Sequence, residues 1–146
     1  MSLKTADRAI DALQRGELKQ AANLFDQCRK KLSQPSHMHA CTATYFKVGR
    51  YGDAQVMLKK LIRQVNITPQ IMSLSGDINK ATGKLDAAVK DYRQAVAMAP
   101  QAAELHYNLA LALFAKVNIV EAKTALECAL KTRPDYVKAL VLLGRC

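Results

Sequence analysis

The sequence predicts an all-α protein made of antiparallel helix pairs that repeat every 34 residues, and two observations lead to this prediction. The first is a recurrence of single residue types at one interval. The sets that share it are Pro35 and Pro69; Pro100 and Pro134; Gly49 and Gly83; Ala54, Ala88 and Ala122; and Leu58, Tyr92 and Leu126. The second is that apolar residues follow helical spacing within each unit, and no segment keeps the alternation of a strand. Together they predict a helical repeat protein.

The second unit shows how each element is predicted. In residues 51–65, Ala54 and Leu58 fall on one face of a helix, and lysines and an arginine occupy the other face. Upstream, residues 36–48 form a first helix with Met38 on its inner face. Along the whole chain this pattern predicts helices at residues 3–15, 18–31, 36–48, 51–65, 69–81, 85–98, 103–116, 119–131 and 136–145.

Glycines mark the turn inside each pair. Gly16, Gly49 and Gly83 stand where the chain leaves a first helix, a position that favours the left-handed backbone conformation. The fourth unit has "KVNI" instead, and we expect Asn118 to take that conformation because asparagine tolerates it best after glycine.

Small residues are predicted to set the distance between paired helices. Gly76 and Ala110 lie midway along first helices, and Ala88 and Ala122 lie near the start of second helices. Small side chains at such points let two helix axes approach closely. We expect the larger residue one turn on, such as Tyr92, to fill the space beside them.

A 34-residue unit with this punctuation resembles the tetratricopeptide repeat (TPR) family. The units are residues 2–34, 35–68, 69–102 and 103–136, with a partial fifth over 137–146, in one predicted domain. The signature places of the clearest unit hold Gly76, Gly83, Ala88, Tyr92, Ala95 and Pro100. Departures from the family pattern are Met38, Met72 and His106 at a large-residue position and Asn66 at a proline position.

The resemblance implies a right-handed superhelix whose first helices line a concave groove. The groove residues it implies here are His39, Phe46 and Lys47; Ser73, Asp77 and Lys80; Tyr107, Asn108 and Leu111; and Lys138. Two specialised family grooves do not fit. The clamp for a C-terminal carboxylate lacks its set of Lys, Asn and Arg, and a ladder of one Asn per repeat is reduced to Asn108.

The predicted function is a protein–protein interaction scaffold that holds a partner peptide or helix in this groove. Because the groove mixes aromatic and aliphatic residues with lysines, we expect a partner with apolar anchors and acidic residues. Tyr107 with Asn108 is the pair expected to matter most.

Two alternatives stay open. The segment would be a non-catalytic TPR region of a larger enzyme, of the sulfotransferase or glycosyltransferase type. Otherwise it would be an RNA-associated module, because residues 1–34 carry 7 basic and 4 acidic groups and residues 35–68 carry 5 and 1. Aromatic residues for base stacking are sparse in that half, so a nucleic-acid partner is not favoured, and a solvated helix face explains most of the charge.

Neither catalysis nor a cofactor is predicted. No serine, cysteine or carboxylate is placed as a plausible nucleophile or as the partner of a histidine base, and "GDINKATGK" lacks the strand that precedes a phosphate-binding loop. His37 and Cys41 are one helical turn apart, but two ligands do not make a metal site. The four cysteines show no disulfide or zinc spacing, which predicts buried free thiols in a reducing compartment.

The two ends of the sequence predict where in the cell the protein is located and whether it continues or self-associates. The first 20 residues lack the apolar core of a signal peptide, and no apolar run is long enough to span a membrane, which predicts a cytoplasmic chain. The last residues, "DYVKALVLLGRC", follow Pro134 as a first helix follows a boundary proline. Its uncovered apolar residues predict that the protein continues beyond Cys146 or associates with another copy of itself.

Overall fold

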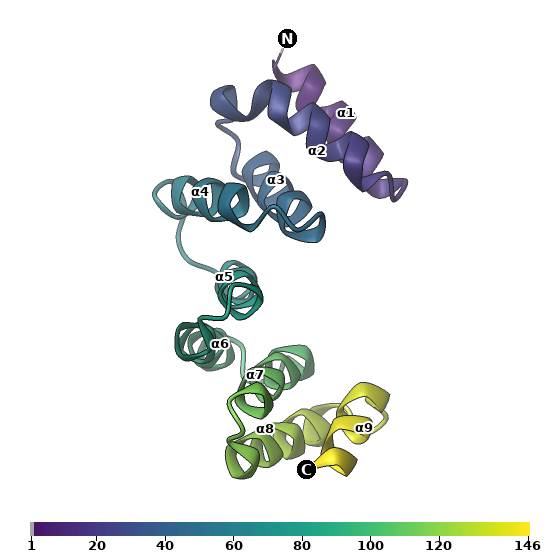
Figure 1. Cartoon of the computed structure of the whole chain (residues 1–146), viewed down its shortest axis with the longest axis vertical. Helices are drawn as coiled ribbons and strands as arrows, with labels where there is room; N and C mark the ends of the chain where they lie inside the picture. Colours follow the sequence, from purple (N-terminus) through teal and green to yellow (C-terminus); the bar gives the residue numbers. More distant parts are fainter. Residues whose placement is uncertain (1) are drawn as a thin grey trace. The chain divides into compact units, whose positions relative to one another are not determined.

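The computed structural model describes residues 2–146, with side chains from Lys4 onward, and this part of the chain is helical without strands (Figure 1). Its α-helices are α1 Ser2–Gln14, α2 Leu18–Cys28, α3 Pro35–Lys47, α4 Tyr51–Ile62, α5 Pro69–Ala81, α6 Leu85–Met98, α7 Ala103–Ala115, α8 Ile119–Thr132 and α9 Val137–Arg145. A short 3₁₀ helix, η1 (Arg29–Lys31), follows α2. The predicted all-α architecture of paired antiparallel helices is confirmed, and most helix ends lie within two residues of their predicted positions.

The helices form two compact units. Unit 1 comprises residues 1–66 and holds α1 to α4, and unit 2 comprises residues 67–146 and holds α5 to α9. The prediction of a single domain stays a prediction. In both units consecutive helices pack as pairs, α1 on α2 and α3 on α4 in unit 1, and α5 on α6 and α7 on α8 in unit 2.

The core of unit 1 includes large side chains from both α2 and α3. Phe25, Met38 and Tyr45 have no exposed surface, so the aromatic and sulfur side chains fill the space between the pairs. Two threonine hydroxyls, of Thr42 and Thr44, are also fully buried. Each donates a hydrogen bond of 2.8 Å to the backbone carbonyl one turn earlier, which removes the cost of burying a polar group.

The core of unit 2 shows why small residues recur. A Cβ placed on Gly76 of α5 would lie 2.6 Å from Cε1 of Tyr92 on α6, closer than carbon atoms can approach. Tyr92 is fully buried, and its hydroxyl donates to the Asp77 carboxylate. In the next repeat Ala110 and Leu126 are likewise fully buried. Glycine is therefore required where the facing residue is a tyrosine ring, as the small–large pattern predicted.

The turns confirm three predicted glycines and correct one position. Gly16, Gly49 and Gly83 all have positive φ, between 78° and 84°. In the fourth repeat the residue in the left-handed conformation is Val117, with φ 61°, and the prediction for Asn118 is wrong. Val117 lies one repeat length after Gly83, and Asn118 instead caps α8 by accepting a hydrogen bond from the Glu121 backbone N–H.

Replacing Val117 by glycine is expected to raise the stability of unit 2 by about 1 kcal/mol. A β-branched residue in the left-handed region is strained by about 1–2 kcal/mol, and part of the relief is offset by the greater freedom of glycine in the unfolded chain. The Val117 side chain is 78% exposed, so its removal costs little packing. Thermal unfolding followed by circular dichroism measures the change. The reciprocal control, Gly83→Val, should destabilise, and equal midpoints for both variants would refute the account.

The last helix packs on one side only among the described residues. Ala139 and Leu142 are buried against α8, whereas Val137, Leu140 and Val141 are 67%, 48% and 54% exposed. The helix therefore carries exposed apolar residues, as the sequence predicted. The expectation that a further segment or a second copy covers them stays a prediction. No helix in the described part of the chain is long and apolar enough to cross a membrane.

The cysteines are free thiols, as predicted, but they are not all buried. Cys28 and Cys41 lie in the core of unit 1, where burial raises the pKa of Cys41 to about 12 and makes that thiol unreactive. Cys128 is half-buried and Cys146 is exposed. No group of three or more His, Cys, Asp or Glu side chains in the described residues is arranged to hold a metal ion.

Candidate functional site

The ten predicted groove residues are divided between the two units. His39, Phe46 and Lys47 lie on α3 of unit 1, and the remaining seven lie on α5, α7 and α9 of unit 2. Six of the predicted residues in unit 2 lie on first helices and remain accessible. We call this set the first-helix face: Ser73, Lys80, Tyr107, Asn108, Leu111 and Lys138.

A direct hydrogen bond joins two of the predicted residues. The Asn108 amide nitrogen on α7 donates to the Ser73 hydroxyl on α5 over 3.3 Å, across 35 positions of sequence. Both side chains are half-buried. The donor half of the Asn108 amide is therefore used to hold two first helices together. Its carbonyl oxygen has no partner among the described residues and can accept a hydrogen bond from a bound backbone N–H.

Tyr107 forms the aromatic part of the same face. Its ring packs against Tyr136, which stands just before α9, with ring centroids 5.4 Å apart and planes tilted by 46°. Such tilted pairs are favourable and hold both rings in fixed orientations. The Arg133 guanidinium covers Tyr136 at 4.6 Å from the ring centre. Tyr107 therefore offers a fixed, half-buried aromatic surface one residue from the free oxygen of Asn108.

The charged members of the predicted set differ in accessibility. Lys138 is exposed and Lys80 is half-buried. Asp77 faces the interior of the pair instead, because its carboxylate accepts the Tyr92 hydroxyl, and burial raises its pKa above the usual value. The Asp77 side chain thus positions Tyr92, and its role toward a partner stays a prediction.

The α3 residues of unit 1 form a second patch. Phe46 packs on Tyr51 with ring centroids 5.7 Å apart, and Lys47 beside it is exposed. Burial lowers the pKa of the His39 imidazole, so the ring is neutral near neutral pH. This patch carries a cation and an aromatic ring, as predicted, but no hydrogen bond links its members.

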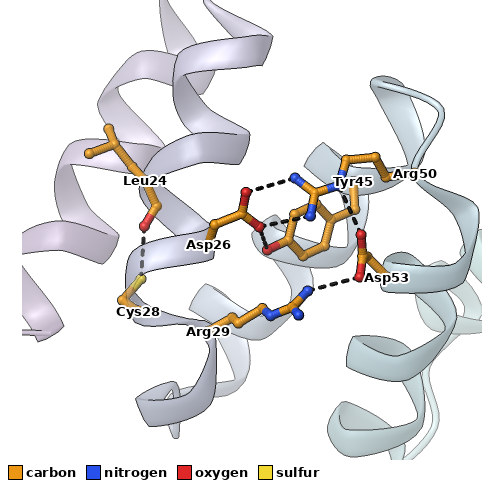
Figure 2. Close-up of polar contacts among 7 residues, drawn as sticks. All are labelled: Leu24, Asp26, Cys28, Arg29, Tyr45, Arg50 and Asp53. Atoms are coloured by element: carbon orange, nitrogen blue, oxygen red, sulfur yellow. Dashed lines mark hydrogen bonds and ion pairs between the residues drawn. The ribbon is translucent and has the colours of Figure 1, made fainter.

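Unit 1 contains an ion-pair network that no sequence pattern indicated (Figure 2). The Arg50 guanidinium donates two bonds to the Asp26 carboxylate, at 2.8 and 2.9 Å, and a third to Asp53 at 2.8 Å. Arg29 of η1 donates to the other oxygen of Asp53 at 2.8 Å. Tyr45 donates its hydroxyl to Asp26 at 2.7 Å, and Arg50 lies 4.5 Å above its ring.

This network ties together α2, η1, α3 and α4. Hydrogen bonds from Arg50 lower the pKa of Asp26, and hydrogen bonds from Arg29 lower the pKa of Asp53. Burial, followed by the hydrogen bond to Asp26, raises the pKa of Tyr45. The two arginines and two aspartates are therefore all charged near neutral pH, and their charges cancel within the network.

A cavity of about 290 Å³ opens beside this network, between η1 and α4. We call it the basic cavity, and its lining residues are Arg29, Lys30, Tyr45, Asp53, Val56, Met57 and Lys60. Its lining shares no residue with the predicted groove, because all of it comes from η1 and the second helix α4 except Tyr45 of the first helix α3.

Unit 2 has a cavity of about 420 Å³ at the equivalent place, between α6 and α8. Five positions line both cavities two repeat lengths apart: Tyr45 and Leu113, Asp53 and Glu121, Val56 and Thr124, Met57 and Ala125, and Lys60 and Cys128. The acidic position is also bridged to an arginine in both units, since Glu121 pairs with Arg93. The spacing between consecutive second helices thus leaves a recurrent cavity whose chemistry each repeat sets separately.

These cavities could have been anticipated only in part. The basic runs "RKK" and "KKLIR" supply Lys30 and Lys60, and the charge excess around them was visible in the sequence. Their convergence was not, because residues on different second helices carry no mutual spacing signal.

Comparison with known proteins agrees with this architecture. Residues 76–117 match the family model described as TPR repeat. With paired antiparallel helices repeating every 34 residues, the chain has the TPR fold. No curated protein sequence matches it.

Several solved structures share this fold. A TPR protein titled YrrB, with an unusual peptide-binding site, superposes with a TM-score of 0.88 at 17% identity, over 97% of this chain and 74% of that one. MamA from Desulfovibrio magneticus RS-1 gives 0.85 at 19% identity, over 99% and 82%. The APC/C hetero-tetramer Cut9-Hcn1 gives 0.85 at 18% identity, over 99% of this chain and 30% of that one. At these identities the likeness concerns the fold.

Proposed function

We propose that this chain is a protein-interaction module that binds an extended peptide or a helix of a partner on the first-helix face of unit 2. The observation that carries the proposal is the hydrogen bond from Asn108 to Ser73, which leaves the Asn108 oxygen free one residue from Tyr107, whose ring packs on Tyr136. A free acceptor next to an apolar ring suits a peptide, which presents a backbone N–H and a side chain together.

The charges of this face favour a partner of opposite sign. Lys80 and Lys138 lie on the first and last of its helices, and Leu111 adds an aliphatic surface between them. A segment with an apolar anchor and acidic residues matches both properties. The same fold in YrrB, which is described as having a peptide-binding site, supports a peptide as the ligand class.

Replacing Tyr107 and Asn108 together by alanine is expected to weaken peptide binding by about tenfold or more. The double change removes the aromatic contact and the backbone acceptor, and interface anchors of this kind each contribute about 1–2 kcal/mol. Peptides selected from a random library on the wild-type protein provide the ligands, and calorimetric titration measures their affinity.

The matched control is Glu127→Ala with Lys123→Ala, two exposed residues of α8 outside this face. These changes should leave the affinity unchanged. A double variant at 107 and 108 that binds the selected peptides as well as wild type, with an unaltered melting temperature, would reject the site.

A further inference from the structure

We propose that unit 1 carries a separate binding site, the basic cavity, and that this site takes an acidic protein segment with one aliphatic side chain. The site is lined by η1, α4 and Tyr45 of α3, and it is independent of the first-helix face of unit 2. Its ligand is identified by three properties of the lining: uncompensated positive charge, an apolar floor and fixed walls.

The positive charge comes from two lysines. Lys30 of η1 and Lys60 of α4 line the cavity, and neither has an acidic partner within ion-pair distance among the described residues. Asp53 cannot serve them, because one of its oxygens accepts from Arg29 and the other from Arg50. Since the network cancels its own charges, the cavity presents a surplus of two cations to solvent.

The floor of the cavity is apolar and the space is small. Val56 is 70% exposed although it stands on a helix beside the core, and Met57 is buried behind it. A volume of about 290 Å³ falls at the lower end of the range of about 300–1,000 Å³ for small-molecule pockets. It suits one aliphatic side chain with its flanking backbone better than a complete cofactor.

The walls are held in place before any ligand binds. Arg29 is fixed by Asp53 at 2.8 Å and lies 6.0 Å from the centre of the Tyr45 ring. Tyr45 is in turn bonded to Asp26. A site whose walls are already ordered loses less entropy on binding than one formed by free side chains.

The equivalent cavity of unit 2 serves as an internal comparison. Cys128 stands where unit 1 has Lys60, and Thr124 stands where it has Val56. The unit 2 cavity therefore has the same position in the repeat, but no lysine lines it, and the arginine in its lining, Arg93, is paired with Glu121. Binding of acidic peptide is expected in unit 1 alone.

A protein segment fits the basic cavity better than a nucleic acid. Bases bind on exposed aromatic faces, and the one aromatic residue in the lining, Tyr45, has no exposed surface. Lys30 and Lys60 share the lining with the apolar residues Val56 and Met57, a combination that matches a segment with both acidic and aliphatic side chains.

The test uses the full chain with isotope-labelled methyl groups and three short blocked peptides. The first is Glu-Asp-Leu-Asp-Glu, the second replaces its acids by amides, and the third replaces Leu by Gly. The first peptide should shift the methyl resonances of Val56 and Met57 in a saturable manner, and each of the others should bind about tenfold more weakly. The methyl groups of Ala125 should not respond.

The variant Lys30→Glu with Lys60→Glu should abolish the shifts, and the matched variant Lys4→Glu with Lys19→Glu should keep them. This control carries the same charge change on exposed residues of unit 1 outside the cavity. The proposal is overturned if the acidic peptide leaves both methyl groups unchanged, or if both charge-reversed variants respond alike. It is equally overturned if an oligouridylate shifts them more strongly than the peptide.

Discussion

Gly76→Ala is expected to lower the free energy of unfolding of unit 2 by about 1–2 kcal/mol. The added Cβ would lie 2.6, 2.8 and 2.9 Å from three carbons of the Tyr92 ring, and overpacking of this kind costs about 1–3 kcal/mol. Alanine regains about 0.5–1 kcal/mol because it favours helix over glycine. Overpacking is the larger effect, because Tyr92 is fully buried and its hydroxyl is bound to Asp77, so the ring cannot move aside cheaply.

The chain itself supplies the compensating change. Ala110 and Leu126 occupy the same two positions one repeat later, and both are fully buried there. Adding Tyr92→Leu to Gly76→Ala should therefore recover stability relative to the sum of the single changes, by about 0.5–3 kcal/mol of coupling. Urea unfolding followed by circular dichroism gives the four free energies of this cycle. Additive effects, or an alanine variant as stable as wild type, would show that the helices do not approach as closely as described.

The second large effect is expected at Arg50. Arg50→Ala should destabilise unit 1 by about 1–2 kcal/mol, because it removes charge-assisted bonds to Asp26 and Asp53 and a cation–π contact with Tyr45. The expected loss of stability is modest because the Arg50 side chain is 35% exposed and solvent screens its ion pairs. Hydrogen exchange of α2 and α4 amides measures the loss and assigns it to unit 1.

Two controls accompany this variant. Arg50→Lys keeps the charge but cannot form the two-pronged bond to Asp26, so it should recover only part of the stability. Arg15→Ala breaks an exposed ion pair with Glu17, at 3.3 Å, and should change stability by less than about 0.5 kcal/mol. Equal losses at Arg15 and Arg50 would contradict a special role for the network.

The cost of Arg50→Ala should also depend on pH. The pKa of Asp26 is lowered in the folded chain, so its stabilising contribution is complete above the unfolded pKa, about 3.9. It is lost as the pH falls through the lowered folded value. The difference between wild type and Arg50→Ala should therefore be constant from neutral pH to about pH 5 and shrink below about pH 4. A difference that grows in acid would have the wrong sign for this network.

The fold followed closely from the sequence, for a local reason. Helix positions, small residues and turn glycines are signals within a single repeat, and each repeat restates them. The exception is Val117. Residue preference favours Asn118 for the left-handed conformation, whereas the repeat length places Val117 at the position equivalent to Gly83. In this turn the position within the repeat, and not the preference of the residue type, determines which residue has the left-handed backbone conformation.

The candidate sites were less predictable. The resemblance placed Ser73, Tyr107 and Asn108 on first helices, but it could not show that Ser73 and Asn108 bond to each other or that Tyr107 packs on Tyr136. The ion-pair network of unit 1 could not be predicted because its members come from positions 26, 29, 45, 50 and 53, and their pairing depends on how α2, α3 and α4 pack. Contacts between repeats are set by packing, and a sequence pattern within repeats does not report them.

The central claim, that the first-helix face of unit 2 binds a protein segment, is tested most directly by backbone amide shift mapping with a peptide selected on the wild-type chain. The account predicts saturable shifts centred on Ser73, Tyr107 and Asn108, with weaker changes at the start of α9. Shifts confined to α6 and α8, with α5 and α7 unchanged, would contradict it.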